Sequence, residues 1–330
     1  MVSVAILDDY QGVALEVADW RALGPAVHVQ VFRDHLKDED RLADRLAPFH
    51  AIVAMRERTP FPTRLLERLP ALRLLVTTGA ANASIDLDAA TRLGILVCGT
   101  RGLKYPTAEL TWGLILALAR HIPQEDQATR RGRWQTTLGV GLQGKVLGVI
   151  GLGTLGSQVA AIGRAFGMSV IAWSQNLTAE RAAECGAALV SKEGLLSRAD
   201  IVTIHLKLSD RTHGLLGPTE LALMKPAAFL VNTSRGPIVE EEALVEALRR
   251  GAIAGAALDV FDDEPLPPDH PLRRLENTVI TPHLGYVTRE GYEVFYRDAA
   301  EDVRAFFDGN PVRALNPDVT SSPGYRGALR

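Results

Sequence analysis

The chain has 330 residues, a length that predicts about two domains rather than one. Hydrophobic residues make up 47% and charged residues 23%, a balance that predicts a packed core and excludes an intrinsically disordered chain. The formal net charge of -3 gives no reason to expect binding to nucleic acid or to an anionic membrane.

Three further features bear on the compartment. The first segment, MVSVAILDDY, lacks the basic stretch and the cleavage site of a signal peptide, so we do not expect export. The longest apolar run, at 114–119, is much shorter than the ~20 residues that span a bilayer. Cys98 and Cys185 are the only cysteines, too few and too far apart to predict a disulfide framework or a zinc site. We therefore expect a cytoplasmic protein with no membrane span and no metal site.

From the first residue to about 290, short runs rich in Val, Ile and Leu alternate with longer helical stretches. This alternation predicts the α/β class, with parallel sheets covered by helices on both faces. In the first hundred residues helices are predicted between the strands, for example at Arg41 to Ala47 and Leu87 to Leu93. The predicted strands of this first domain are Val2 to Leu7, Val27 to Phe32, Ala51 to Met55, Leu72 to Thr77 and Ile95 to Cys98.

A second domain is predicted after a long helix. Pro106 can open a helix, and Thr107 to Arg130 is predicted as one helix with an apolar first half and a charged second half, long enough to bridge two domains or two subunits. The strands predicted after it are Val146 to Ile150, Val170 to Trp173, Ile201 to His205, Phe229 to Asn232, Ala254 to Leu258, and Val279 to Ile280. Beyond them we expect a helix at Glu290 to Phe307 that packs on the first domain, and a poorly ordered tail from Pro317.

A glycine motif stands between a strand and a helix of this second domain. Gly151, Gly153 and Gly156 form a complete G-x-G-x-x-G, with Thr154 and Leu155 between its last two glycines. The first glycine allows a tight turn, the second lets a pyrophosphate approach the backbone, and the third lets the helix pack on the strand. The motif therefore predicts a dinucleotide-binding Rossmann domain.

The selectivity between NAD and NADP is not predicted. NAD-binding domains of this type carry an acidic residue about 20 residues after the glycines, to bind the ribose hydroxyls. Here the strand ends at Trp173 and continues with Ser174 and Asn176, and no carboxylate occurs before Glu180. Serine and asparagine can hydrogen-bond either a hydroxyl or a phosphate. We therefore expect NAD(P) as cofactor and leave the preference open.

Three polar segments follow strands of the second domain, where ligands bind in open α/β sheets. They are Asn232 to Gly236, Asp259 to Pro265, and Thr281 to Gly285. Together with the glycine motif, these segments resemble those of the D-isomer-specific 2-hydroxyacid dehydrogenases, and the resemblance runs from about Thr77 to Asn310. A departure is Lys207, which stands where that family usually has proline.

The resemblance implies hydride transfer between NAD(P)H and a small 2-keto acid or D-2-hydroxy acid. His283 is the candidate acid and base, because the pKa of an imidazole lies near neutral pH. Glu264 would orient the imidazole and favour its charged form, and Arg235 would hold the substrate carboxylate and polarise the carbonyl. Backbone amides at Gly79 and Ala80 are implied to bind the same carboxylate.

The resemblance also assigns residues to the cofactor and a place to the site. In addition to the glycine motif, Ser174 and Asn176, the candidates for cofactor binding are His205, Thr233 and Asp259, with Asp259 on the nicotinamide amide. The predicted architecture is two Rossmann-like, doubly wound parallel-sheet domains with the active site in the cleft between them. A flavodoxin-like substrate domain would comprise 1–104 and 292–330, and the NAD(P)-binding domain 105–291.

An alternative function, a second role for one arginine and an expected homodimer also follow from the sequence. An NAD(H)-sensing, corepressor-like binding protein of the same fold would keep the same Arg, Glu and His, so those residues do not exclude it. Arg56, which follows a strand of the first domain, would reach a second charge on the substrate or would simply face solvent. Family members usually form two-fold homodimers through the cofactor domain and the long helix, and we expect a homodimer here.

Overall fold

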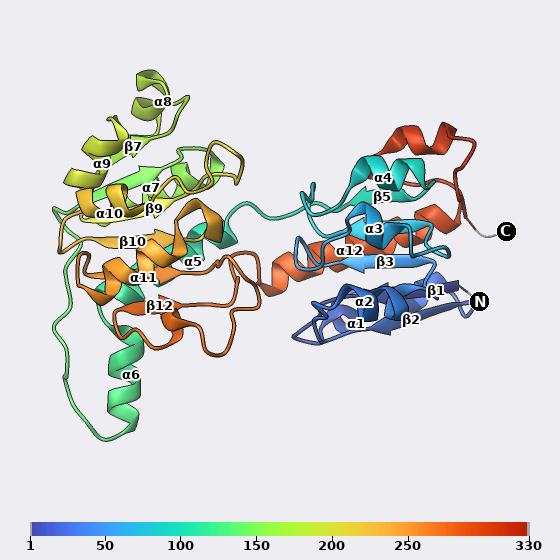
Figure 1. The fold of residues 1–330 in the computed structure, drawn as a ribbon, viewed down its shortest axis with the longest axis horizontal. Coiled ribbons are helices and arrows are strands. Elements are labelled where there is room, and N and C mark those ends of the chain that lie inside the picture. Colours follow the sequence, from blue (N-terminus) through green and yellow to red (C-terminus); the bar gives the residue numbers. More distant parts are fainter. Residues whose placement is uncertain (1, 329–330) are drawn as a thin grey trace. The chain divides into compact units, whose positions relative to one another are not determined.

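The computed structural model describes residues 2–328 and divides into two compact units (Figure 1). Unit 1 contains the residues up to Leu103 and those from Thr288 onward, and unit 2 is Lys104–Val287. Each unit contains one sheet in which every paired strand is parallel, with helices packed against it. The predicted α/β class is confirmed. Within residues 2–328, no helix is both long enough and apolar enough to cross a membrane.

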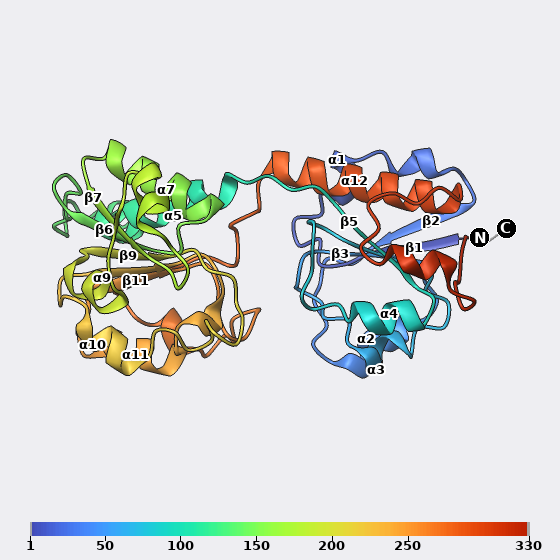
Figure 2. The same ribbon diagram turned by 90° about the horizontal axis from the view of Figure 1, so that it is seen from above.

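The sheet of unit 1 has the strand order β2-β1-β3-β4-β5, which is the flavodoxin-like order. Its strands are β1 (Val2–Ile6), β2 (Val27–Val31), β3 (Ala51–Ala54), β4 (Leu74–Thr77) and β5 (Leu96–Gly99). Its helices are α1 (Ala14–Val17), η1 (Trp20–Leu23), α2 (Glu39–Leu46), α3 (Thr63–Leu66), α4 (Leu87–Arg92), α12 (Arg289–Phe307) and η4 (Pro317–Ser321). Figure 2 shows α1 and α12 on one face of this sheet and α2, α3 and α4 on the other. Strands β3, β4 and β5 are buried at every residue, since helices cover both faces of the sheet.

The C-terminal segment is part of unit 1. The Asn316 side chain accepts a hydrogen bond from Val97 N–H and donates to the Ile95 carbonyl, so it extends the polar pairing at β5. Further on, the guanidinium of Arg326 donates to the carbonyls of Leu69 and Leu72. The prediction of a poorly ordered tail is therefore wrong for 317–328. Buried backbone acceptors of unit 1 are satisfied by this segment.

The sheet of unit 2 has the strand order β12-β11-β10-β9-β6-β7-β8. Its strands are β6 (Val146–Ile150), β7 (Ser169–Trp173), β8 (Ala188–Leu189), β9 (Ile201–Ile204), β10 (Phe229–Asn232), β11 (Gly255–Leu258) and β12 (Thr278–Ile280). Its helices are α5 (Pro106–Ala119), α6 (Ile122–Arg130), α7 (Thr154–Ala165), α8 (Ala179–Glu184), α9 (Lys192–Arg198), α10 (Pro218–Leu223), η2 (Gly236–Ile238), α11 (Glu241–Arg249) and η3 (Pro271–Arg273). Two buried hydrophobic clusters lie against this sheet, and together they form the core that holds the strand ends in place.

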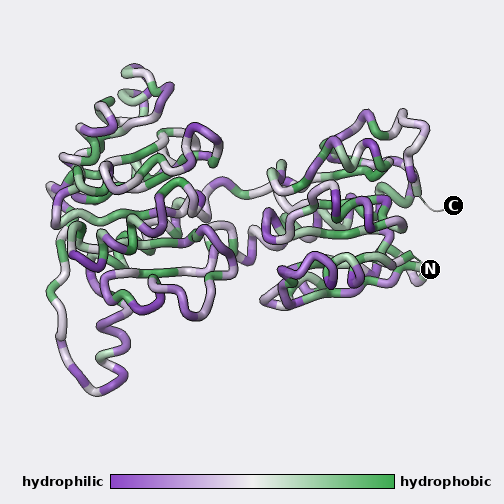
Figure 3. The backbone as a smooth tube through the Cα atoms, in the orientation of Figure 1, coloured by the Kyte–Doolittle hydropathy of each residue, from purple (hydrophilic) through white to green (hydrophobic). Residues whose placement is uncertain are grey.

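One predicted element of unit 2 is wrong. The long helix expected over 107–130 is two helices, α5 and α6, because His121 between them has a left-handed backbone with φ of 52°. Pro123 then lies in the first turn of α6, where its missing N–H is tolerated, whereas in a helix interior it would remove a hydrogen bond. Figure 3 shows α6 mainly in the hydrophilic colour, which fits its exposed charged residues.

Candidate active site

The polar segments predicted from the sequence all follow strands of the unit 2 sheet. Because its strands are parallel, their carboxyl ends lie at one edge, where open α/β sheets bind ligands. The glycine motif follows β6, Ser174 follows β7, and His205 follows β9. Arg235 follows β10, and Asp259 follows β11. The sheet order therefore brings to one edge residues that are far apart in the sequence.

The glycine motif forms a tight turn between β6 and α7. Gly151 has φ of 97°, a conformation that favours glycine, and a Cβ there would lie 2.5 Å from the carbonyl oxygen of His205. At Gly156 a Cβ would lie 1.9 Å from the carbonyl oxygen of Gly151, so only glycine lets α7 pack this closely on the turn. Both positions exclude larger residues for structural reasons.

Gly153 differs, since the space where a Cβ would project is open to 4 Å among the described residues. Gly153 caps α7, and no side chain of the described chain accepts a hydrogen bond at this cap. Exposed N–H groups at the start of a helix, together with the helix dipole, favour a phosphate. The open position and the uncapped helix fit a dinucleotide pyrophosphate, with exposed Thr154 and half-buried Leu155 in the first turn.

The end of β7 carries no charge. Trp173 closes the turn through its carbonyl, which accepts the Gly151 N–H at 2.8 Å. Ser174 is half-buried and its carbonyl accepts the Leu177 N–H, while Asn176 is exposed. Hydroxyl and amide groups at this point fit the ribose of either dinucleotide.

His205 lies at the end of β9 beside the glycine turn. Its Nε2 is 2.9 Å from the hydroxyl of Thr203, and its Nδ1 is shielded from solvent and has no hydrogen-bond partner among residues 2–328. Burial lowers the pKa of His205 to about 4, so the ring is neutral at neutral pH. The contact of its carbonyl with Gly151 links β9 to the turn. This geometry gives His205 a structural part in shaping the cofactor turn.

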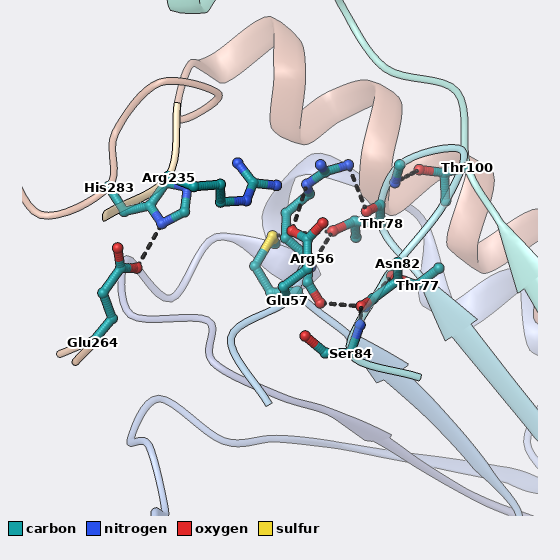
Figure 4. A network of polar contacts seen from close by, with 12 residues as sticks. Arg56, Glu57, Thr77, Thr78, Asn82, Ser84, Thr100, Arg235, Glu264 and His283 are labelled. Carbon is teal, nitrogen blue, oxygen red and sulfur yellow. Dashed lines mark hydrogen bonds and ion pairs between the residues drawn. The ribbon is translucent and has the colours of Figure 1, made fainter. Parts of the chain in front are cut away.

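His283 and Glu264 form a close pair in unit 2 (Figure 4). His283 Nδ1 lies 2.6 Å from Glu264 Oε2, and the other Glu264 oxygen accepts the Phe261 N–H at 2.9 Å. Burial raises the pKa of Glu264, but the hydrogen bond and charge of His283 outweigh it, so this pKa lies below its ordinary value. The carboxylate is therefore ionised at neutral pH and accepts the Nδ1 proton. The Nε2 atom of His283 remains as the site that can give or take a proton.

Arg235 follows β10 in a loop that is braced by its neighbours. The Asn232 amide donates to the Arg235 carbonyl and accepts the Ser234 N–H, which fixes the turn. A Cβ at Gly236 would lie 2.2 Å from the backbone of Phe261, so this loop packs directly on the loop that carries Glu264. The guanidinium is close enough to contribute to the lowered pKa of Glu264. Arginine, glutamate and histidine are thus assembled at one place in unit 2.

Asp259 has a second function that the sequence does not indicate. Its buried carboxylate accepts hydrogen bonds from the Thr281 hydroxyl at 2.6 Å and from the N–H groups of Leu284 and Gly285 at 2.7 and 2.8 Å. His283, between these residues, has φ of 56°, an uncommon conformation for histidine. Burial raises the pKa of Asp259, although the hydrogen bonds oppose that shift. Asp259 therefore holds the His283 loop in its unusual conformation.

Thr233 is engaged by α5. Its hydroxyl lies 2.8 Å from that of Thr111, and Thr111 also donates to the Thr107 carbonyl. Thr107 donates in turn to the Gly285 carbonyl at 2.8 Å. This chain of hydroxyls connects the end of β10 with the loop of His283. The Thr233 side chain is therefore a structural link in this structure, and its candidate cofactor contact stays a prediction.

In unit 1, the segment after β4 carries the two amides implied in substrate binding. The Gly79 N–H donates to the Thr100 hydroxyl at 2.7 Å, so this amide is already occupied. Ala80 is exposed, and within residues 2–328 its N–H donates to no protein group. Ala80 is therefore better placed than Gly79 to bind an anion.

Arg56 follows β3 of unit 1 and lies against the segment after β4, in the network of Figure 4. Its backbone has φ of 52° and is held by a hydrogen bond from its N–H to the Thr78 hydroxyl. The guanidinium lies against Gly79, where a Cβ would be 1.8 Å from Nη1, and it also pairs with Glu57 at 3.5 Å. The positive charge is thus placed directly beside the candidate anion-binding segment.

The chain was compared with known proteins. The model of the D-isomer specific 2-hydroxyacid dehydrogenase NAD binding domain matches residues 112–285, all within unit 2. Over 274 residues the chain is 46% identical to a glyoxylate reductase of Aeropyrum pernix, covering 79% of this chain and 82% of that protein. It is 38% identical to a D-3-phosphoglycerate dehydrogenase of Archaeoglobus fulgidus, covering 84% of this chain and 54% of that one. A crystal structure of a phosphoglycerate oxidoreductase from Vibrio cholerae has a TM-score of 0.89 and 38% identity, covering 94% of this chain and 100% of the other.

These matches agree with the site geometry. The family model covers more than half of the chain, and the Aeropyrum pernix relative matches over most of both lengths. A nicotinamide dinucleotide as cofactor, and hydride transfer between it and a 2-keto or 2-hydroxy acid, were expected from the sequence and are confirmed at that level. The chain belongs to the family of D-isomer-specific 2-hydroxyacid dehydrogenases.

Proposed function

We propose that the chain is a 2-keto acid reductase for a small substrate of the glyoxylate or hydroxypyruvate class. The observation that carries the proposal is the 2.6 Å contact between His283 Nδ1 and Glu264 Oε2 at the same strand-end edge as Arg235 and the glycine turn. The 46% identity to a glyoxylate reductase supports a small substrate. The reverse reaction would oxidise the corresponding D-2-hydroxy acid.

The proposed mechanism assigns one step to each side chain. A bound dihydronicotinamide would supply hydride for the keto carbon, so that negative charge would develop on the carbonyl oxygen. His283 donates the proton at Nε2 to that oxygen, while the Glu264 carboxylate stabilises the imidazolium before the transfer. The Arg235 guanidinium binds the substrate carboxylate through two N–H groups and polarises the carbonyl. The net change is a keto acid, a proton and the reduced cofactor converted into a hydroxy acid and the oxidised cofactor.

The two units are proposed to divide binding between them. Unit 2 would be the NAD(P)-binding domain, with the glycine turn, Ser174 and Asn176 on the dinucleotide, and unit 1 the substrate domain, with Ala80 on the carboxylate. The match of the NAD binding model within unit 2 supports the first assignment. Use of NADPH as well as NADH is supported by the absence of a carboxylate at 174–176.

Arg56 is proposed to favour substrates with a second negative group. Its guanidinium lies beside Gly79, on the candidate anion-binding segment, and pairs with Glu57 at 3.5 Å. We expect Arg56→Gln to weaken kcat/KM for a phosphorylated or dicarboxylic keto acid much more than for glyoxylate. An equal loss for all substrates would assign Arg56 to the fold of the segment instead.

The partner and compartment are also proposals. The segment 131–141 is exposed throughout, and Trp134 and Leu138 are 77% and 92% exposed, which supports a homodimer formed through unit 2. The two cysteines are free and Cys98 is buried, which is compatible with a cytoplasmic location.

The test is a substrate panel with both cofactors. Glyoxylate, hydroxypyruvate, pyruvate, oxaloacetate and phenylpyruvate are each incubated with NADH or NADPH, and loss of absorbance of the reduced cofactor is followed. We expect the highest kcat/KM with glyoxylate or hydroxypyruvate, and loss of turnover in His283→Gln with cofactor binding retained. Tight cofactor binding without turnover on any substrate would contradict the proposal and favour the NAD(H)-sensing alternative.

A further inference from the structure

The loop that carries Glu264 is joined at both ends to one side chain of α11. Glu241 begins α11, and its Oε2 accepts the Asp262 N–H at 3.4 Å, just before Glu264. Its Oε1 lies 2.9 Å from Nε2 of His270, at the far end of the same loop. The side chains of Glu241 and His270 are largely shielded from solvent, at 19% and 17% exposed. One carboxylate therefore closes the segment from Asp262 to His270.

The proton positions in this contact follow from the second nitrogen of His270. Its Nδ1 accepts the Leu272 N–H at 3.3 Å and caps η3, so Nδ1 carries no proton in this arrangement. The proton is then on Nε2, where it is donated to Glu241. The ring thus connects two groups with two different atoms, and each connection can be removed without the other.

The acidic end of this loop lies near the surface. Asp262, Asp263 and Pro265 are exposed, and Glu264 is 31% exposed. On the far side of Glu264 the loop is braced by Arg273, which donates to the carbonyls of Leu266 and Pro267. Loss of the Glu241 contact would free the chain on the Asp262 side, and a displacement of about 1 Å at a catalytic pair can cost roughly 10²-fold in rate.

We propose that Glu241 and His270 form a clasp that positions Glu264 against His283, so that Glu241 is a positioning residue for proton transfer. The inference rests on the proposed role of the His283–Glu264 pair. The charged groups that face the clasp are Asp262, whose pKa is raised by partial desolvation and then by Glu241, and His213, which together with His270 opposes that shift. The groups that face His283 are Glu264, Asp259 and the ring of Tyr286, with Arg235 beside Glu264.

Two substitutions of His270 separate the clasp from the helix cap. Glutamine places a donor near the position of Nε2 and keeps the Glu241 contact, whereas asparagine places an acceptor near Nδ1 and keeps only the Leu272 cap. Glu241→Ala removes the clasp from the other side. Glu246→Ala is the matched control, since Glu246 lies on the same helix and its side chain pairs with exposed Arg250 at 3.1 Å, away from the loop of Glu264.

Two measurements are made on each folded variant. The first is the pH profile of kcat/KM for keto-acid reduction, and the second is an NMR titration of the His283 ring, identified by its absence in His283→Gln. For Glu241→Ala and His270→Asn we expect roughly 10-fold lower kcat/KM, a lower titration midpoint and unchanged KM for the cofactor. His270→Gln and Glu246→Ala should behave as the parent.

The outcomes are distinct. A parent-like titration midpoint in Glu241→Ala would overturn the clasp. So would a lower kcat/KM and midpoint in His270→Gln together with parental values in His270→Asn, because that result would assign His270 to the cap alone. If kcat/KM and the midpoint fall in both His270 variants, the result supports the clasp when Glu241→Ala shows the same decrease. It overturns the clasp when Glu241→Ala does not. Because the NMR titration needs no turnover, a parent without activity would contradict the proposed function while leaving the clasp testable.

Discussion

The two halves of the strand-end edge of unit 2 differ in their charges. At β11 and β12, Asp259 and Glu264 each accept hydrogen bonds that fix one loop conformation, and Glu264 pairs with His283. At β7 and β9, Ser174 and His205 present neutral groups, since burial lowers the pKa of His205 to about 4. Two histidines at equivalent strand ends therefore have different properties, because only one has a carboxylate partner. A carboxylate partner, rather than the strand-end position, therefore makes a histidine suitable for proton transfer.

The largest effect is expected at the charged half, from Arg235→Lys. Lysine keeps the charge but loses the planar pair of donors, so the carboxylate is held and the carbonyl polarised less well. We expect kcat/KM for reduction to fall by roughly 10²-fold or more, about 2.7 kcal/mol of transition-state binding. Steady-state kinetics measure it, with Arg250→Lys, at the exposed C-terminal cap of α11, as control. Near-parental activity would mean that the carboxylate is bound elsewhere.

At the neutral half, we expect His205 to affect stability rather than the reaction. Its folded pKa of about 4 lies below the unfolded value of about 6.5, so the unfolded chain gains the proton first as the pH falls. The stability contribution is complete above pH ~6.5 and is lost between that pH and ~4, by roughly 3 kcal/mol. His205→Gln does not titrate and keeps a donor near Thr203. Urea unfolding at several pH values should show this loss in the parent and a smaller one in the variant, whereas parallel curves would contradict it.

Glu264→Gln removes the charge from the pair but keeps a group that can orient the ring. In the proposed mechanism the enzyme competent for reduction has His283 protonated, so we expect the rate to fall as the pH rises. The carboxylate favours the imidazolium, and without it the proton is lost at lower pH. We expect the alkaline limb of kcat/KM to move down by roughly one pH unit, with activity partly retained in acid. Asp263→Asn removes a neighbouring charge as control, and an alkaline limb that stays in place would show that Glu264 does not act on His283.

The sequence predicted the strands well because both faces of these sheets are covered. A strand buried on both sides is a continuous apolar run, as in Phe229–Asn232, and the run ends where the polar loop begins. The same logic placed Arg235, Glu264 and His283 at strand ends. It failed for β8, whose two residues Ala188 and Leu189 are exposed and leave no apolar run.

The roles of some residues, and the order of the C-terminal segment, depend on contacts that sequence patterns do not predict. The three hydrogen bonds to Asp259 join it to residues more than twenty positions away, and nothing local distinguishes it from a cofactor ligand. The Gly79 amide was expected to bind substrate, but the Thr100 hydroxyl, which comes from the end of the next strand, occupies it. In the C-terminal segment, composition indicated disorder, although Asn316 and Arg326 satisfy backbone groups of unit 1. Such long-range polar contacts determine whether a segment is ordered, and the hydrophobic periodicity of the sequence does not predict them.

The smallest effect is expected from Ser174→Asp, which adds to the neutral half the charge that it lacks. An acidic side chain at the end of β7 binds the ribose hydroxyls of NAD and repels the 2'-phosphate of NADP. Ser174 is half-buried and no ion pair competes for its position among residues 2–328, so the new carboxylate can face the ribose. We expect a several-fold higher KM for NADPH, with the KM for NADH little changed. Ser174→Asn, of equal size without charge, is the control and should leave both KM values close to those of the parent. If the aspartate variant keeps the parental ratio of the two KM values, Ser174 does not face the ribose. The proposed cofactor contacts, beginning with those of the glycine turn, would then have to be assigned to other residues.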